Sequence, residues 1–263
     1  MKINFLSDLH LEGNTPPKNL LSKPYAPTGD VVLLIGDIAN ARSLERVDEY
    51  FGNCGKDVLY VPGNHEYYGG DWEIQVDRMV KHFAKTSPNI KVMDDDYIQI
   101  GDVYFLGGTF WSNISPADER DAARCIADFR AFPNRQGILK SVIEGCTINR
   151  QRQAHKLSYE WFDLMLGNIR RKDPDAKIVC FTHFPPSWQA QEARFKGTGL
   201  GSYFYSKSEY LIEKHQPNFW LYGHTHGNIC WDHGITKVLS NQFGYSSEFV
   251  TQKYFDQHRE IEL

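Results

Sequence analysis

The chain has 263 residues, of which 41% are hydrophobic and 24% charged, and its net charge at neutral pH is −4. This length suits one large domain over residues 1–263, and the slightly acidic balance argues against the basic footprint of proteins that bind duplex DNA or RNA. The five cysteines are odd in number and form no Cys-x-x-Cys pair, so neither a disulfide framework nor a structural zinc knuckle is expected. Cys180 and Cys230 lie in apolar runs and are predicted to be core thiols.

No apolar stretch approaches the ~20 residues of a membrane span, and the run that opens the chain is too short for a signal peptide. A cytoplasmic location without a membrane partner is therefore expected. No feature of the sequence indicates an oligomeric state.

Three short apolar runs in the first quarter of the chain each end at a turn and a polar motif. They are Ile3–Leu6, Val31–Ile35 and Val58–Val61. The segments between them are loop-rich or helical, so the pattern predicts βαβ units that feed a sheet with parallel strands. Asp71–Lys85 is predicted to be a helix with Asp71 as its N-cap and with apolar residues at helical spacing, namely Val76, Met79, Val80 and Phe83.

The second half of the chain adds a hairpin, a long helix and further strands. Ile98–Ile100 and Val103–Leu106 flank Gly101-Asp102, a connection typical of hairpins. The region 111–152 is predicted to be an irregular insertion with short helices, and Phe195–Ser206 a loop with three glycines. An amphipathic helix is predicted over Ala154–Arg171, with Ala154, Leu157, Trp161, Leu164 and Met165 on one face. Further strands are predicted at Lys177–Phe181, Phe219–Tyr222 and Thr236–Ser240. The fold class is α/β, with two sheets face to face and helices outside.

Five short motifs carry carboxylate, amide or imidazole groups, and four of them directly follow an apolar run. They are Asp8-Leu9-His10, Gly36-Asp37, Gly63-Asn64-His65-Glu66, Thr182-His183 and Gly223-His224-Thr225-His226. In an extended segment residues i and i+2 point to the same side, so each of the two pairs with this spacing, Asp8/His10 and His224/His226, is expected to reach one ion. Gly36 allows a tight turn, and the two oxygens of Asp37 can bridge two ions.

Each motif alone has an ordinary interpretation as packing or as a turn, but their joint occurrence indicates metal. The other five histidines have no partner at ligand spacing and are interpreted as core or surface residues: His82, His155, His215, His233 and His258. Imidazole and carboxylate ligands without thiolate favour Mn, Fe, Zn or Co over Ca or Mg. Two ions bridged by one carboxylate would lie ~3.5–4 Å apart, which suits activation of water and in-line phosphoryl displacement.

The five motifs together resemble those of the calcineurin-like metallophosphoesterase superfamily, and most of all those of its small bacterial and phage-type phosphohydrolases. The superfamily's pattern is D-x-H, G-D, G-N-H-[DE], a lone H and G-H-x-H. The motifs span residues 8–226. The resemblance implies a four-layer α/β/β/α sandwich with two mixed β-sheets. It also implies two ligand sets, one made of Asp8, His10, Asp37 and His226, the other of Asp37, Asn64, His183 and His224.

The resemblance further implies that a metal-bridging hydroxide attacks phosphorus. His65 would bind no metal; it would stabilise the transition state or protonate the leaving oxygen. An acid often supports this histidine, and by chain position Asp37 or Glu66 is a candidate.

Two positions depart from the pattern. Asn40 stands where many relatives have the second aspartate of G-D-x-x-D; this position usually lies outside the ligand set, so metal binding is expected to survive. Phe184 stands where many close relatives have a second histidine, a position interpreted as facing the substrate. Substrate assignments therefore do not transfer from relatives.

Weaker signals surround the motifs. Five aromatic residues form either a wall that stacks a nucleobase or aryl group, or ordinary packing: Tyr67, Tyr68, Trp111, Phe184 and Trp188. The segment 197–201 lacks the spacing of a phosphate loop and no clear helix follows it, so it is interpreted as a mobile rim loop. Arg130, Arg135 and Arg194 are either phosphate-gripping residues or solvated surface charges.

The main hypothesis is a dinuclear metal-dependent phosphoesterase that acts on a small phosphoester or a nucleotide. A cyclic-nucleotide phosphodiesterase or a nuclease is the alternative within the enzyme class. A non-catalytic binding module is less favoured, because none of the seven ligand positions nor His65 has been replaced.

Overall fold

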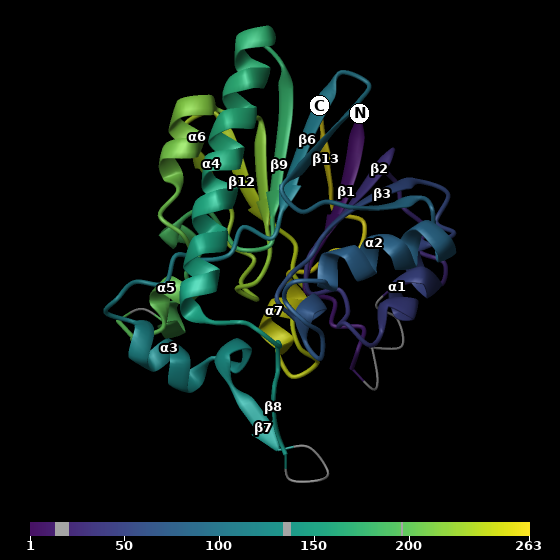
Figure 1. Ribbon diagram of the computed structural model, residues 1–263. Helices are drawn as coiled ribbons and strands as arrows, with labels where there is room; N and C mark the ends of the chain where they lie inside the picture. The colour runs from purple at the N-terminus through teal and green to yellow at the C-terminus, as the bar shows by residue number, and fades with distance from the viewer. Residues whose placement is uncertain (14–20, 134–137, 196) are drawn as a thin grey trace.

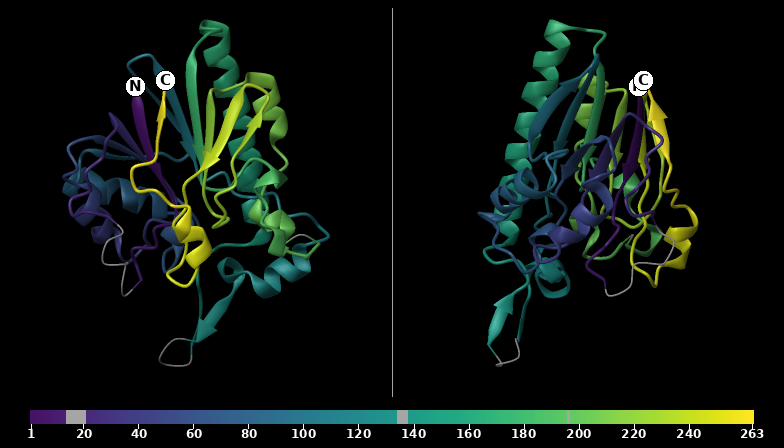
Figure 2. Two further views of the ribbon diagram at one scale, coloured as in Figure 1. Left: turned by 180° about the vertical axis from the view of Figure 1, so that it is seen from behind. Right: turned by 90° about the vertical axis from the view of Figure 1, so that its right-hand side faces the viewer.

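Two mixed β-sheets lie face to face with helices on both outer sides in the computed structural model, which describes residues 1–13, 21–133, 138–195 and 197–263 (Figure 1). The first sheet has the order β13-β1-β2-β3-β4, in which β13 is antiparallel to β1 and the other pairs are parallel. Figure 2 shows β13 beside β1, which brings the two chain ends together. The bounds are β1 Lys2–Leu6, β2 Val31–Ile35, β3 Asp57–Val61, β4 Ile90–Val92 and β13 Glu260–Glu262.

The second sheet has the order β11-β12-β10-β9-β6-β5, with parallel pairs inside and an antiparallel strand at each edge. Ile100 pairs with Val103 across the turn, which confirms the predicted hairpin at Gly101-Asp102. Both sheets are mixed, as predicted, although β4, β11 and β13 were not foreseen. The bounds are β5 Asp96–Ile100, β6 Val103–Gly108, β9 Lys177–Thr182, β10 Phe219–Tyr222, β11 Trp231–His233 and β12 Thr236–Ser240.

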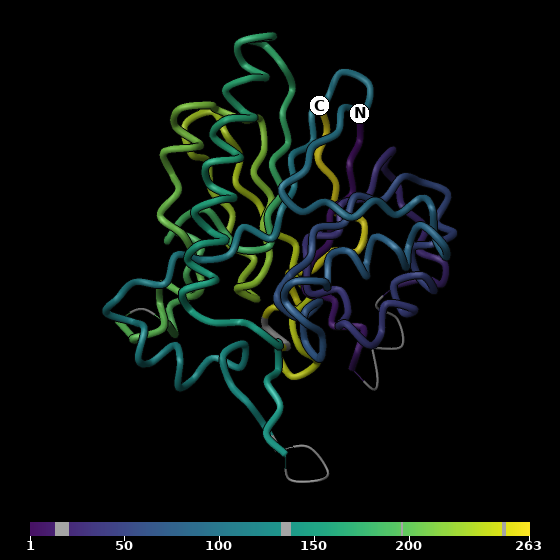
Figure 3. Tube along the Cα trace, viewed as in Figure 1, coloured from purple at the N-terminus to yellow at the C-terminus, as the bar shows by residue number. Residues whose placement is uncertain are grey.

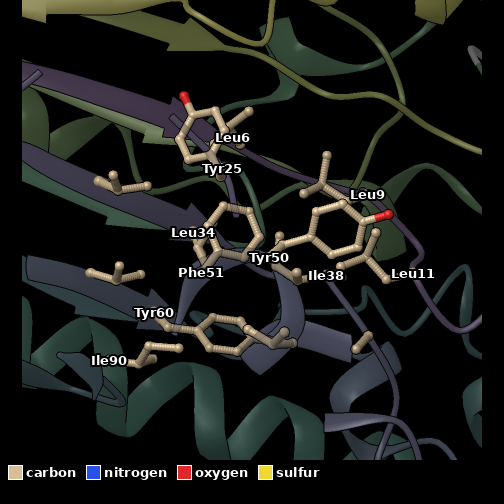
Figure 4. Close-up of a cluster of buried hydrophobic side chains, with 14 of the residues drawn as sticks. Leu6, Leu9, Leu11, Tyr25, Leu34, Ile38, Tyr50, Phe51, Tyr60 and Ile90 are labelled. Carbon is tan, nitrogen blue, oxygen red and sulfur yellow. The ribbon is translucent and has the colours of Figure 1, made fainter. Parts of the chain in front are cut away.

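Three apolar clusters separate the four layers. The first packs one face of the first sheet against α1 (Leu44–Phe51) and α2 (Gln75–Thr86), as Figure 4 shows for Leu34 and Phe51. The second lies between the sheets and includes Leu33. The third packs the second sheet against α4 (Ile148–Lys172) and α6 (Glu209–His215). Neighbouring residues such as Leu33 and Leu34 are thus buried on opposite faces, which is why the strands are continuous apolar runs.

The long helix α4 buries a different face from the predicted one. Its buried residues recur at steps of three or four: Ile148, Gln151, His155, Ser158, Phe162, Leu166 and Ile169. Leu157 and Leu164, which were predicted for the buried face, are 57% and 60% exposed. The apolar pattern misled because the true face contains polar residues with buried partners: His155 Nδ1 lies 2.7 Å from Trp111 O, and Ser158 Oγ donates to Asp95 Oδ2 at 2.7 Å.

Three smaller predictions also need correction. The helix α2 begins at Gln75 rather than at Asp71, because Asp71 Oδ1 accepts a hydrogen bond from Glu73 N and forms a turn. Val80, predicted for its apolar stripe, is exposed. Cys180 is buried as predicted, but Cys230 is exposed and is therefore no core thiol.

The segments 111–152 and 195–206, which connect strands of the second sheet, lie together at the end of the molecule where the parallel strands finish (Figure 3). The segment 111–152 contains short helices, as predicted, and also the antiparallel pair β7–β8 and the first residues of α4. The predicted loop Phe195–Ser206 contains the short helix α5, a difference from expectation. The bounds are α3 Glu119–Cys125, η2 Ala127–Phe129, β7 Ala131–Pro133, β8 Leu139–Ser141, α5 Gly201–Phe204 and α7 Phe249–Lys253. The remaining turns are η1 His65–Tyr67, η3 Trp188–Ala190 and η4 Ala193–Phe195. Among the described residues, no helix combines the length and apolar character needed to cross a bilayer.

Candidate metal centre

The five motifs meet where strands from both sheets end. Asp8, Asp37 and Asn64 follow β1, β2 and β3 of the first sheet, whereas His183 and His224 follow β9 and β10 of the second. Parallel strands finish at a common edge, so residues separated by up to 216 positions come together there. All seven predicted ligands are buried.

The backbone around the ligands departs from the expected extended form. Five predicted ligands have left-handed φ values: Asp8 (55°), His10 (47°), Asp37 (53°), His224 (72°) and His226 (52°). The argument that i and i+2 residues converge because the chain is extended is therefore wrong. Asp8 and His10 nevertheless lie in one group of candidate ligands, whereas His224 and His226 lie in two different groups. Left-handed φ costs a residue with a side chain about 1–3 kcal/mol and persists only where the surroundings impose it. Such strain is typical of functional sites.

One cluster joins the end of β1 to the end of β10. It contains Asp8, His10, Asp37 and His226, whose ligand atoms all lie within 4.8 Å of one another. The Nε2 atoms of His10 and His226 are 3.1 Å apart, and His226 Nε2 lies 3.3 Å from Asp8 Oδ1. The opposite nitrogens face carboxylates, because His226 Nδ1 contacts Glu248 and His10 Nδ1 contacts Glu12. Both imidazoles are thereby oriented with Nε2 toward the cluster.

A second cluster shares Asp37 with the first and adds His183 and His224. His183 Nε2 lies 3.3 Å from Asp37 Oδ1 and 3.2 Å from Asn64 Oδ1. His183 Nδ1 donates to Ile35 O at 3.0 Å, which leaves the lone pair on Nε2. His224 Nε2 is buried and has no hydrogen-bond partner among the described residues. Buried polar atoms need a partner, and a metal ion would supply one here, so the donor set fits a pair of ions.

Glu66 connects the motif Gly36-Asp37 to its own motif by hydrogen bonds. Its buried carboxylate accepts hydrogen bonds from the backbone N–H groups of Gly63, Asp37 and Ile38 at 2.6–2.9 Å. Burial and the nearby charge of Asp37 raise the pKa of Glu66 to about 7. Because Glu66 is engaged in holding the Asp37 loop, it is not the acid that supports His65.

His65 lies beside the two clusters that share Asp37 rather than within them. Its Nδ1 donates to Glu12 Oε1 at 2.9 Å, and its Nε2 lies 3.0 Å from the hydroxyl of Tyr245 and 4.0 Å from Asp37 Oδ2. The ring of Tyr68 stacks on His65 at 4.1 Å between centroids. Burial lowers the pKa of His65, but the charges of Asp37 and Glu12 outweigh burial and raise it to about 9.

Asp128 orients the amide of Asn64. Its Oδ1 accepts from Asn64 Nδ2 at 3.1 Å and from the Tyr68 hydroxyl at 2.7 Å, while its Oδ2 accepts from the Tyr203 hydroxyl at 2.7 Å. The amide nitrogen therefore faces Asp128 and the amide oxygen faces His183. Burial raises the pKa of Asp128. Asp128 belongs to η2 in the segment 111–152, and no motif in the sequence marked it.

A cavity of about 270 Å³ opens beside the clusters. Its metal-facing side is formed by Asp37, Asn64, His65, His224 and His226. We call the other lining residues the cavity wall; its main members are Tyr68, Ile126, Arg194, Phe195, Phe204 and Tyr245. Arg194 is the only Lys or Arg side chain among the described lining residues, and its guanidinium is paired with Glu192 and with Glu248. The wall, as far as the structure describes it, is thus mainly aromatic and apolar, and its one guanidinium is paired with carboxylates.

The predicted aromatic residues divide between wall and core. Tyr68 lines the cavity, whereas Tyr67, Trp111 and Phe184 are buried in a separate apolar cluster. Trp188 is 51% exposed and does not line the cavity. Sequence reasoning missed the remaining wall aromatics because they follow no motif.

Phe184 and Asn40, the two residues that differ from the family pattern, take part in packing and in a turn. Phe184 is fully buried with its ring 3.9 Å from that of His224, so the interpretation of this position as facing the substrate is wrong for this chain. Asn40 Oδ1 accepts from Arg42 N and from Ser43 Oγ, both at 2.9 Å, and closes a turn away from the clusters. Of the predicted arginines, Arg194 lines the cavity, Arg130 lies over the ring of Phe132, and Arg135 is outside the described residues.

A sequence profile of calcineurin-like phosphoesterases matches residues 1–228. The chain belongs to the calcineurin-like phosphoesterase family. As a calcineurin-like phosphoesterase it is 27% identical over 272 residues to protein L509 of Acanthamoeba polyphaga mimivirus, an alignment that covers 94% of this chain and 92% of that protein. Its fold is similar to that of phosphopantetheinyl hydrolase from Mycobacterium tuberculosis, with a TM-score of 0.69 and 15% identity over 99% of this chain and 95% of the other.

Proposed function

We propose that the protein is a dinuclear metal-dependent phosphoesterase. One ion would be held by Asp8, His10, Asp37 and His226, the other by Asp37, Asn64, His183 and His224. The observation that carries this proposal is the pair of buried clusters that share Asp37, in which His224 Nε2 has no protein partner in the described part of the chain. Two bound ions of Mn, Fe, Zn or Co would activate water and neutralise charge on the phosphoryl oxygens.

His65 is the residue that we assign to the leaving group. Its Nε2 faces the cavity beside the clusters, 4.0 Å from the shared carboxylate of Asp37. A phosphorus atom held over Asp37 would place its leaving oxygen near this nitrogen. His65 would then donate a proton to that oxygen as the P–O bond breaks.

The cavity wall favours a leaving group that is aromatic or apolar. Tyr68, Phe204 and Tyr245 offer ring surface, and the one cation, Arg194, is already paired with carboxylates. A long nucleic acid would bring many phosphates to a cavity whose described lining offers no unpaired Lys or Arg, so a nuclease for polymers is disfavoured. The same rings suit a nucleobase, which keeps a cyclic-nucleotide phosphodiesterase as the second candidate.

The direct test is metal analysis of the purified protein followed by assays with p-nitrophenyl phosphate and bis(p-nitrophenyl) phosphate in added Mn²⁺. We expect bound transition metal and hydrolysis of at least one ester. Absence of both metal and activity would refute the proposal. Rates on cyclic nucleotides and on a phosphopantetheine diester then distinguish between the substrate classes. The second substrate is suggested by the name of the phosphopantetheinyl hydrolase whose fold is similar.

A further inference from the structure

Glu12 is the acid that contacts His65. The Oε1 atom of Glu12 accepts from His65 Nδ1 at 2.9 Å and lies 3.1 Å from His10 Nδ1. The other acids near His65 in the chain or in space are engaged elsewhere, since Glu66 holds the Asp37 loop and Asp37 belongs to both clusters. Glu12 thus joins a predicted metal ligand to the predicted leaving-group residue.

The contacts on His65 fix the direction of its free nitrogen. Because Nδ1 donates to Glu12, Nε2 points into the cavity, where Tyr245 and Asp37 are its nearest polar neighbours. Stacking by Tyr68 fixes the plane of the ring but permits both orientations that a half-turn about the Cβ–Cγ bond exchanges. Glu12 selects one of these two orientations, because only one of them places Nδ1–H against its carboxylate and Nε2 toward the cavity.

We propose that Glu12 is a positioning residue that aims His65 Nε2 at the leaving oxygen; this inference rests on the proposed function. In the reaction the P–O bond breaks and its electron pair goes to the leaving oxygen, which takes the proton from His65 Nε2. The oxygen of water forms the new P–O bond and its proton passes to solvent, which reprotonates His65. Throughout this cycle Nδ1–H stays hydrogen-bonded to Glu12, so Glu12 itself touches no reacting atom.

The kinetic test compares Glu12→Ala, Glu12→Gln and wild type on p-nitrophenyl phosphate and on phenyl phosphate. Phenoxide is the more basic leaving group and depends more on proton donation. We expect Glu12→Ala to lower kcat about 10–100-fold on phenyl phosphate and much less on the nitrophenyl ester, a range typical of lost orienting contacts. Glu12→Gln retains a carbonyl acceptor for Nδ1–H and should recover part of the loss. Glu12 also contacts Nδ1 of His10, so both variants should bind metal more weakly, and all rates are compared at saturating Mn²⁺.

A double-mutant cycle with His65 and a control variant at Glu248 test whether the effect of Glu12 acts through His65. In a His65→Ala background, Glu12→Ala should cost nothing further, because residues that act as a unit are not additive. Glu248 contacts Nδ1 of His226 as Glu12 contacts His65, but it has no contact with His65. Glu248→Ala should therefore weaken metal binding, as Glu12→Ala does through His10, but at saturating Mn²⁺ it should change the rates on the two esters by the same factor.

An independent readout separates this proposal from the function on which it rests. In ¹⁵N–¹H spectra of the Zn²⁺-loaded protein, the Nδ1–H signal of His65, assigned by its absence in His65→Ala, should shift or vanish in Glu12→Ala. An unchanged Nδ1–H signal overturns the proposal even if the enzyme is active. Equal losses on both esters at saturating Mn²⁺, or additivity with His65→Ala, also overturn it. A wild-type protein that hydrolyses no ester, with the Nδ1–H signal still dependent on Glu12, retains the contact but overturns its catalytic purpose together with the proposed function.

Discussion

The two clusters and the cavity wall border the same cavity but are built in different ways. The clusters stand on residues that directly follow β1, β2, β3, β9 and β10, and buried partners such as Glu66 hold their backbone. The wall comes from the connecting segments, with Ile126 before η2, Phe195 in η4 and Phe204 in α5. Sheet ends are rigid and place donors accurately, whereas connecting segments tolerate change. If the proposed function holds, residues at the strand ends would carry out the chemistry and residues of the connecting segments would select the substrate.

The largest effect should come from the carboxylate that both clusters share. Asp37→Ala should remove at least one ion and lower kcat/KM by about 10³-fold or more, because charge stabilisation at the phosphoryl group would be lost. Metal stoichiometry by mass spectrometry and ester kinetics measure both effects. Asp102→Ala, which removes an exposed carboxylate paired with Lys177, is the control and should retain both ions. Full occupancy of both sites in Asp37→Ala would rule out bridging.

The next effect separates chemistry from metal binding within the same cavity. His65→Ala should keep both ions and lose about 10²–10⁴ in kcat, the usual contribution of a positioned proton donor. The loss should be greater for phenyl phosphate than for the nitrophenyl ester. His233→Ala changes a histidine on β11, far in the fold from the clusters, and should leave the rate unchanged. Disappearance of an ion from His65→Ala would contradict its assigned role.

The third prediction concerns Asp128, a residue of a connecting segment, and tests whether such segments also contribute to metal affinity. Asp128→Ala frees the amide of Asn64 to turn, and we expect affinity for one ion to fall about 10–100-fold. Calorimetric titration of the metal-free protein with Mn²⁺ measures this change. Tyr203→Phe removes only one of the hydrogen bonds on Asp128 and should have a smaller effect. Equal Mn²⁺ affinities in wild type and Asp128→Ala would show that Asp128 does not support metal binding, which would then depend on the residues at the strand ends.

The smallest effect should come from the wall itself. Phe204→Ala should raise KM for aryl esters about 5–30-fold with little change in kcat, since burial of an aromatic ring contributes about 1–2 kcal/mol to binding in such a site. Phe132→Ala on β7 is a matched control, because that ring is 42% exposed and does not line the cavity. A fall in kcat without a change in KM would place Phe204 in the chemistry instead.

Much of the fold was predictable because local patterns reflect burial. The runs that became β1, β2, β3, β9 and β10 are apolar throughout, since both of their faces are covered, and each finishes at a turn. The face of α4 was predicted wrongly because His155 and Ser158 are buried with hydrogen-bond partners on other elements. Periodicity of apolar residues cannot register a polar side chain whose partner lies more than 40 residues away.

The sequence by itself determined the five motifs, their order and the donor atoms they carry, and these agree with the membership of the chain in its family. Only the tertiary structure decided that Glu12 contacts His65, that Asp128 turns Asn64, and that Phe184 packs behind His224. The left-handed backbone at the ligands was likewise not visible in the sequence. Hydrogen bonds between separate motifs hold it, such as those from Asp8 N to Gly36 O and from Asp37 N to Glu66. A motif records which atoms a site needs, while the contacts that aim those atoms join residues 53 and 64 positions apart and follow no local rule.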